Sequence, residues 1–126
     1  MGPASSSTAA GQLTEDGDDN VIRNVTLIEF KPDTPVEHLD AITEAMHKVR
    51  SPGLRSLTMG RDLGLREGNL QYAVVADFDD EQGYRAFVED PEHQRIAREM
   101  TMPAYIRYQR VQFEISATDS VRDLPG

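Results

Sequence analysis

Residues 21–31 read VIRNVTLIEFK, a run rich in the β-branched and aromatic residues that favour a β-strand. Side chains alternate between the two faces of a strand, and both faces here are apolar near the middle. Val25 and Leu27 lie on one face, and Ile28 and Phe30 lie on the other. A strand of this kind needs an apolar partner on each side, so this stretch predicts a sheet that is covered on both faces.

The patterns on either side of this strand predict the remaining elements. Helical spacing of apolar residues predicts helices at about 35–50 and 80–89, with a restart that runs from 91 to about 102. Alternating patterns predict strands at 54–62, 70–78 and 105–115. The order strand, helix, strand, strand, helix, strand is the ferredoxin-like βαββαβ pattern, an α+β fold with a four-stranded antiparallel sheet. Helices cover only one face of such a sheet, so the second face predicts a homodimer packed sheet to sheet as a dimeric α/β barrel.

Local signals predict how the helices begin. Residues 34–37 (TPVE) match a capping box with Thr34 as the cap, and Asp79 or Asp80 is expected to cap the helix at 80–89. His38 and His47 fall off the apolar stripe of the first helix, so we expect both to be solvated.

Residues 90–93 (DPEH) predict a helix start with a histidine in its first turn. Asp90 is a good N-cap and Pro91 suits the first helical position, which places His93 on the apolar face shared with Ile96. The positive end of the helix dipole disfavours imidazolium, so a neutral imidazole is available as a general base. The alternative is a packed histidine that is hydrogen-bonded to a neighbour.

Composition narrows the class of protein. The chain has 126 residues with a net charge of −9, no cysteine and no basic stripe, which argues against a nucleic-acid partner. Residues 1–20 and 116–126 are poor in large apolar side chains and are expected to be disordered, which leaves one domain at 21–115. No transmembrane run or secretory signal is visible, so we expect no membrane association and a cytoplasmic protein. The three histidines lack the spacing of metal ligands, so neither a metal nor another cofactor is expected.

Four stretches in this order resemble the dimeric α/β-barrel family, also called stress-responsive A/B barrel or Dabb domains. They are residues 21–32 (VIRNVTLIEFKP), 60–64 (GRDLG), 75–80 (VADFDD) and 87–94 (FVEDPEHQ). The resemblance spans nearly all of residues 21–115 and implies the same fold and homodimer.

The best understood enzyme type of this family is the plant olivetolic acid cyclase, a polyketide cyclase that closes a poly-β-keto thioester by aldol chemistry. Its general base is the histidine of a Pro-x-His motif, and His93 matches that position. An assisting tyrosine of the family is replaced by Phe87, a first-strand histidine by Asn24, and a third-strand pocket histidine by Tyr72. The resemblance therefore implies a shared pocket in which most of the polar groups differ.

These positions predict an apolar cavity with a few polar groups, suited to a small aromatic or polyketide-like ligand. The candidate catalytic residues are His93, Tyr72 and Asn24. The expected walls of the cavity are Phe87, Ile28, Tyr84 and Ile96. The alternative is that Asn24 and Tyr72 satisfy one another or the backbone. Two functions stay open: a cyclase or lyase-like biosynthetic enzyme with His93 as base, and a non-catalytic stress-responsive binding protein.

Overall fold

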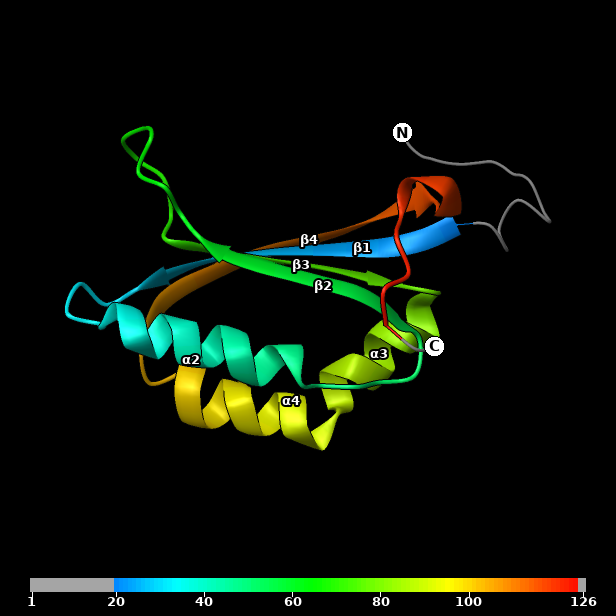
Figure 1. Cartoon of the computed structure of the whole chain (residues 1–126), viewed down its shortest axis with the longest axis horizontal. Coiled ribbons are helices and arrows are strands. Elements are labelled where there is room, and N and C mark those ends of the chain that lie inside the picture. The colour runs from blue at the N-terminus through cyan, green and yellow to red at the C-terminus, as the bar shows by residue number, and fades with distance from the viewer. Residues whose placement is uncertain (1–19, 125–126) are drawn as a thin grey trace.

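The computed structural model describes residues 20–124 and has one helical layer against one sheet (Figure 1). The strands are β1 (Asn20–Phe30), β2 (Leu54–Arg61), β3 (Tyr72–Phe78) and β4 (Tyr105–Ser116). The helices are α2 (Val36–His47), α3 (Glu81–Glu89) and α4 (Pro91–Ile96), followed by a π-helical segment (Ala97–Thr101) and a short 3-10 turn (Ala117–Asp119).

The sheet has the strand order β2-β3-β1-β4, and each neighbouring pair is antiparallel. The helices cover one face of the sheet, and of the described residues the C-terminal segment and the β2–β3 loop lie on the opposite side (Figure 1). This is the predicted ferredoxin-like α+β fold. We call the two faces the helix-side face and the outer face.

The core lies between the helices and the helix-side face, where the side chains of alternate residues meet. Ile28 and Phe30 of β1, with Tyr72 and Phe78 of β3, are buried there against Leu39, Ile42 and Met46 of α2. The opposite set on β1 behaves differently, because Leu27 is 39% exposed on the outer face. Val21 of the same set is only 2% exposed, so within a single chain the outer face of this strand is covered at its start but not at its middle.

Two predictions about helix α2 are wrong. Thr34 does not cap it: the helix begins at Val36 after Pro35, without a side-chain cap hydrogen bond. His38 is not simply solvated, since it is half-buried and its Nε2 donates to the Met100 carbonyl at 2.7 Å. The partner is 62 residues away, so local periodicity does not reveal it. His47 is exposed, as expected.

The two acidic caps form as predicted. The Asp80 carboxylate accepts a hydrogen bond from Gly83 N at 2.8 Å, and the Asp90 carboxylate accepts one from His93 N at 2.9 Å. Helix α4 then widens, because Met102 N donates to Ala97 O, five residues earlier. This π-helical turn places Thr101 in a buried position facing the sheet. Segments of this type are often found at functional sites.

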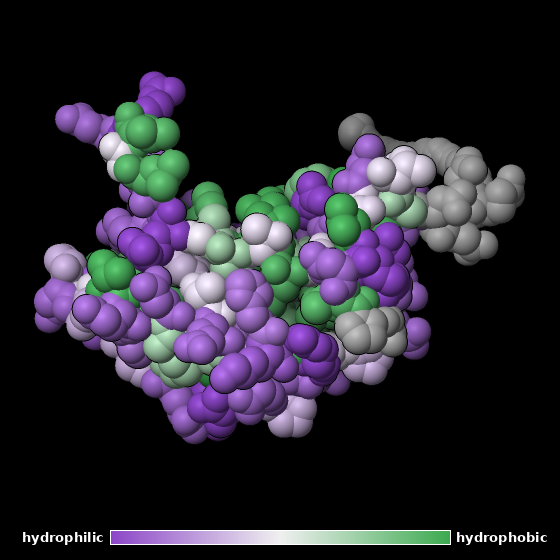
Figure 2. Space-filling view, viewed as in Figure 1, coloured by the Kyte–Doolittle hydropathy of each residue, from purple (hydrophilic) through white to green (hydrophobic). Residues whose placement is uncertain are grey.

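The outer face and the β2–β3 loop expose apolar side chains. Val111 and Phe113 of β4 are 55% and 45% exposed, and Leu63 at the projecting loop is 82% exposed. Figure 2 shows apolar residues on the sheet side and in the projecting loop, whereas the helical layer is largely polar. Across residues 20–124, no helix is long and apolar enough to cross a bilayer.

The C-terminal segment requires a correction. Ser120 Oγ donates to the Asp77 carboxylate at 2.7 Å, and the amides of Asp123 and Leu124 both donate to the Arg55 carbonyl at 3.0 Å. Residues 117–124 are therefore held on the sheet, although their composition predicted a disordered tail. Their partners are a buried carboxylate and the backbone of an edge strand, neither of which is visible in the local sequence. The predictions for residues 1–19 and 125–126 lie outside the described residues.

Candidate functional site

A cavity of about 280 Å³ lies between the helix-side face and the helical layer. Its walls are mostly apolar and come from all four strands, from α2, α3 and α4, and from the π-helical segment. Helix α3 is brought close to the sheet at Gly53 and Gly83, where an added Cβ on Gly53 would lie 2.8 Å from Gly83 Cα. That close approach places Phe87 and Tyr84 of α3 at the cavity wall.

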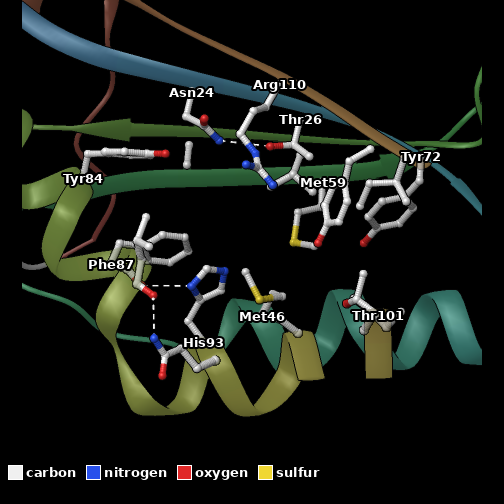
Figure 3. Close-up of a pocket in the computed structure, with 18 residues that line it drawn as sticks. Asn24, Thr26, Met46, Met59, Tyr72, Tyr84, Phe87, His93, Thr101 and Arg110 are labelled. Atoms are coloured by element: carbon white, nitrogen blue, oxygen red, sulfur yellow. Dashed lines mark hydrogen bonds between the residues drawn. The ribbon is translucent and has the colours of Figure 1, made fainter. Parts of the chain in front are cut away.

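His93 points into this cavity from the first turn of α4 (Figure 3). Its ring stacks on Phe87 with centroids 4.1 Å apart, and its Nδ1 donates to the Phe87 carbonyl at 2.9 Å. Because Nδ1 carries the proton in that hydrogen bond, Nε2 of the neutral ring is left with a free lone pair. Burial lowers the pKa of His93 and outweighs the opposite effects of the Phe87 carbonyl and Asp90. The ring is therefore neutral at pH 7 and suited to accept a proton.

A chain of amide and hydroxyl groups lies opposite, on β1 and β4. Gln112 Nε2 donates to Asn24 Oδ1 at 2.6 Å, and Asn24 Nδ2 donates to Thr26 Oγ1 at 3.1 Å. Asn24 and Thr26 are both buried, at 8% and 9% exposure. Asn24 thus lines the cavity as predicted by sequence, but its amide is already engaged at both ends.

Tyr72 also lines the cavity and is buried, with its hydroxyl against the Thr43 hydroxyl. Thr43 donates to the Leu39 carbonyl at 3.1 Å, so it accepts the hydrogen of Tyr72. Burial raises the pKa of the Tyr72 hydroxyl, which stays protonated. Its donor is therefore used within the protein, and what it presents to the cavity is mainly an aromatic wall.

The structure brings most of the sequence candidates together and separates one. His93, Asn24, Tyr72, Phe87, Tyr84 and Ile28 all line the cavity. Ile96 does not, because it is fully buried in the core beneath the cavity wall.

Arg110 is a cavity residue that the sequence candidates do not include. It points from β4 toward the helical layer (Figure 3), with its Cζ 5.1 Å from the centroid of the Tyr108 ring. The alternation of side chains along β4 could have indicated this position. Tyr108, Arg110 and Gln112 lie on one face of the strand, and Val111 and Phe113 lie on the other. The polar residues of the last strand, rather than its apolar ones, face the site.

Comparisons with known proteins agree with this architecture. A family model described as the stress responsive A/B barrel domain matches residues 22–117. A dimeric ferredoxin-like protein of unknown function from Thermobifida fusca is 31% identical, with a TM-score of 0.71 over 76% of this chain and 92% of that chain. No functionally curated protein matches the sequence significantly.

More distant structures share the fold. A hydroxynitrile lyase from Passiflora edulis is 18% identical, with a TM-score of 0.67 over 78% of this chain and 95% of that chain. A Dabb family protein from Mesorhizobium loti is 14% identical, with a TM-score of 0.61 over 75% of this chain and 95% of that chain. At these identities the likeness is one of fold alone.

Proposed function

Since this chain belongs to the stress responsive A/B barrel domain family, as its sequence motifs predicted, we propose that its cavity binds a small, largely apolar organic ligand and that His93 acts on it as a general base. The observation that carries this proposal is the His93 ring. Its Nδ1 donates to the Phe87 carbonyl, burial lowers its pKa, and the ring faces a largely apolar cavity. A neutral imidazole in that position accepts protons at physiological pH.

The reaction class that fits is a cyclase or lyase-like step that begins with proton removal. In an aldol ring closure the base takes a proton from the carbon beside a carbonyl. In the cleavage of a hydroxynitrile, the activity named for the Passiflora edulis neighbour, a base takes the hydroxyl proton. Both steps develop negative charge on an oxygen or carbon of the ligand, which hydrogen-bond donors across the cavity would stabilise.

Asn24 and Tyr72 orient the ligand in this proposal, but in different ways. Asn24 holds Thr26 in place through the bond from its amide, so its effect on a ligand oxygen passes through the Thr26 hydroxyl. Tyr72 packs against the ligand as a ring, since its hydrogen is bound by Thr43. Phe87, Tyr84 and Ile28 complete the apolar walls.

The working unit in this proposal is a homodimer packed through the outer face. Leu27, Val111 and Phe113 form an exposed apolar surface there, and the Thermobifida fusca relative is described as dimeric. Burying these side chains against a second copy removes apolar surface from water, which is the main driving force of association.

A second function, binding without catalysis, is favoured by one observation. Asn24 and Tyr72, the two polar groups expected to contact a substrate, are both hydrogen-bonded to other side chains. A site whose polar groups are already satisfied is suited to an apolar ligand that is held and released unchanged.

Deuterium exchange separates the two functions without knowledge of the natural substrate. The protein is incubated in D₂O with a panel of aryl ketones, and exchange beside the carbonyl is followed by NMR; release of benzaldehyde from mandelonitrile is followed in parallel. Catalysis is expected to fall by about 10²–10⁴-fold in His93→Gln and to be unchanged in His47→Gln, an exposed histidine on α2. Ligand binding with rates equal to those in buffer alone would instead establish the non-catalytic function.

A further inference from the structure

The cavity contains one formal charge, and that charge is positive. Among the residues that line it, only Arg110 is charged when His93 is neutral, and none is an aspartate or glutamate. This is unusual in a chain whose net charge is −9. The local charge of the cavity is therefore opposite to that of the protein as a whole.

Arg110 also lacks the carboxylate partner that every other arginine on a β-strand of the described chain has. On the same strand, Arg107 pairs with Glu29 at 2.9 Å across the outer face, and on β1 Arg23 pairs with Asp77 at 2.8 Å. No carboxylate within residues 20–124 lies within 4.0 Å of the Arg110 guanidinium, whose close neighbour is the Tyr108 ring. Stacking on an aromatic ring leaves the hydrogen-bonding edge of a guanidinium free.

The hydrogen-bond chain on the sheet directs a second donor to the same space. Gln112 donates to Asn24, and Asn24 donates to Thr26. The last hydroxyl of this chain, on Thr26, is therefore the group that can donate to a ligand in the cavity. Thr26 accepts with its oxygen, and within residues 20–124 its own hydroxyl hydrogen is bound to no acceptor. A buried hydroxyl in this state is most stable when an acceptor binds it.

We infer that the ligand of this cavity is an organic acid whose carboxylate binds to the Arg110 guanidinium and the Thr26 hydroxyl. This inference rests on the proposed function and specifies its substrate class. A carboxylate only accepts hydrogen bonds, and it matches the planar fork of a guanidinium. Figure 3 shows Arg110 and Thr26 on the sheet side and His93 on the helix side, so the carbon body of the acid extends from the sheet toward the imidazole.

The arrangement predicts a preference for acids over their neutral esters. A methyl ester keeps the carbon body but loses the charge, so it forms weaker hydrogen bonds and adds bulk at Arg110. Charge-assisted hydrogen bonds to one guanidinium correspond to about 10–100-fold in affinity. His93 contributes little to this preference, since it lies on the opposite wall and is neutral.

The test uses a matched pair of probes, 4-oxo-4-phenylbutanoate and its methyl ester, with the full chain. Dissociation constants are measured by NMR titration for wild type, Arg110→Gln, Thr26→Val and the control Arg98→Gln, which removes the same charge from the exposed surface of the helical layer. Thermal melts establish that each variant is folded. We expect the acid to bind at least tenfold more tightly than the ester, and this ratio to fall to near one in Arg110→Gln, to fall partly in Thr26→Val and to be unchanged in Arg98→Gln.

Three results would overturn the inference: no saturable binding of the acid at millimolar concentration, equal binding of acid and ester by wild type, or a preference that persists in Arg110→Gln. His93→Gln separates this inference from the proposed function. If that variant loses deuterium exchange while acid and ester bind equally to wild type, general-base catalysis stands and the acid ligand is wrong. If wild type shows the acid preference but no exchange above buffer, the acid ligand stands and catalysis is wrong.

Discussion

Asp77→Asn tests the contribution of a buried ion pair on the outer face, whose carboxylate also binds the C-terminal segment. The Asp77 side chain is 2% exposed and accepts two hydrogen bonds from Arg23, at 2.8 and 2.9 Å, and one from Ser120 at 2.7 Å. Asparagine has nearly the same volume, but it removes the charge and replaces one acceptor with an NH₂ donor facing other donors. The substitution therefore breaks the ion pair without creating a cavity.

The structure sets the expected size of the effect. Removing one partner of a fully buried ion pair costs about 3–5 kcal/mol. The Arg23 side chain is 32% exposed, so water stabilises its guanidinium after the Asp77 charge is removed. The cost of the substitution is therefore smaller than for a fully buried pair. We expect the free energy of unfolding to fall by about 2–3 kcal/mol, which corresponds to roughly 10 °C in the melting temperature of a domain this size.

The same pair predicts a dependence on pH. Burial raises the pKa of Asp77, but the hydrogen bonds from Arg23 and Ser120 and the charges of Arg23 and Arg55 outweigh it, so the folded pKa is lowered. Asp77 in the unfolded chain titrates near pH 3.9. The carboxylate thus stabilises the fold above that pH, and its contribution is lost as the pH falls through the folded pKa. The difference between wild type and Asp77→Asn should shrink below about pH 4.

Urea denaturation followed by circular dichroism, at one protein concentration and from pH 7 to pH 3, measures both effects. Glu29→Gln is the matched control, because Glu29 pairs with Arg107 on the same face of β1 but is 30% exposed, whereas Asp77 is 2% exposed. That control should cost less than about 1 kcal/mol. An Asp77→Asn variant that loses no more stability than Glu29→Gln at pH 7 would refute the reasoning about the buried pair.

Three further predictions concern the site and the outer face. Asp90→Ala removes the cap that binds His93 N and should lower the free energy of unfolding by about 1 kcal/mol and shift the His93 ring signals in NMR spectra; Asp90→Ser should restore both. Because the folded pKa of His93 is lowered, wild type should lose stability as the pH falls through about 6.5, where the unfolded histidine takes up a proton. His93→Gln should flatten that step in denaturation curves, and a wild-type stability that rises over the same range would contradict the neutral-imidazole assignment. Phe113→Glu should convert a dimer to a monomer in micromolar light scattering, whereas Met102→Glu on the helical layer should not; a monomeric wild type would remove the sheet-to-sheet argument.

The local sequence was sufficient for the elements and for the position of His93. Alternation along β1 and β3 and the acidic caps at Asp80 and Asp90 are short-range features, and the structure reproduces them. The His93 position follows from the same cap, since the third helical residue of α4 lies on the face with Ile96. The C-terminal segment was predicted incorrectly, because its stability comes from Asp77 and Arg55, residues more than 40 positions away.

By itself, then, the sequence determined the order of strands and helices, the two-sided character of β1 and the neutral histidine at the start of α4. These depend on spacings of two to four residues, over which side-chain direction is set by backbone geometry. Only the tertiary structure decided which polar groups share the cavity. The antiparallel register of β1 and β4 puts Gln112 opposite Asn24 and Arg110 opposite Thr26, more than 80 residues apart along the chain. Such pairings are made by the whole sheet, so the charge of the cavity is a property of the fold rather than of any one segment.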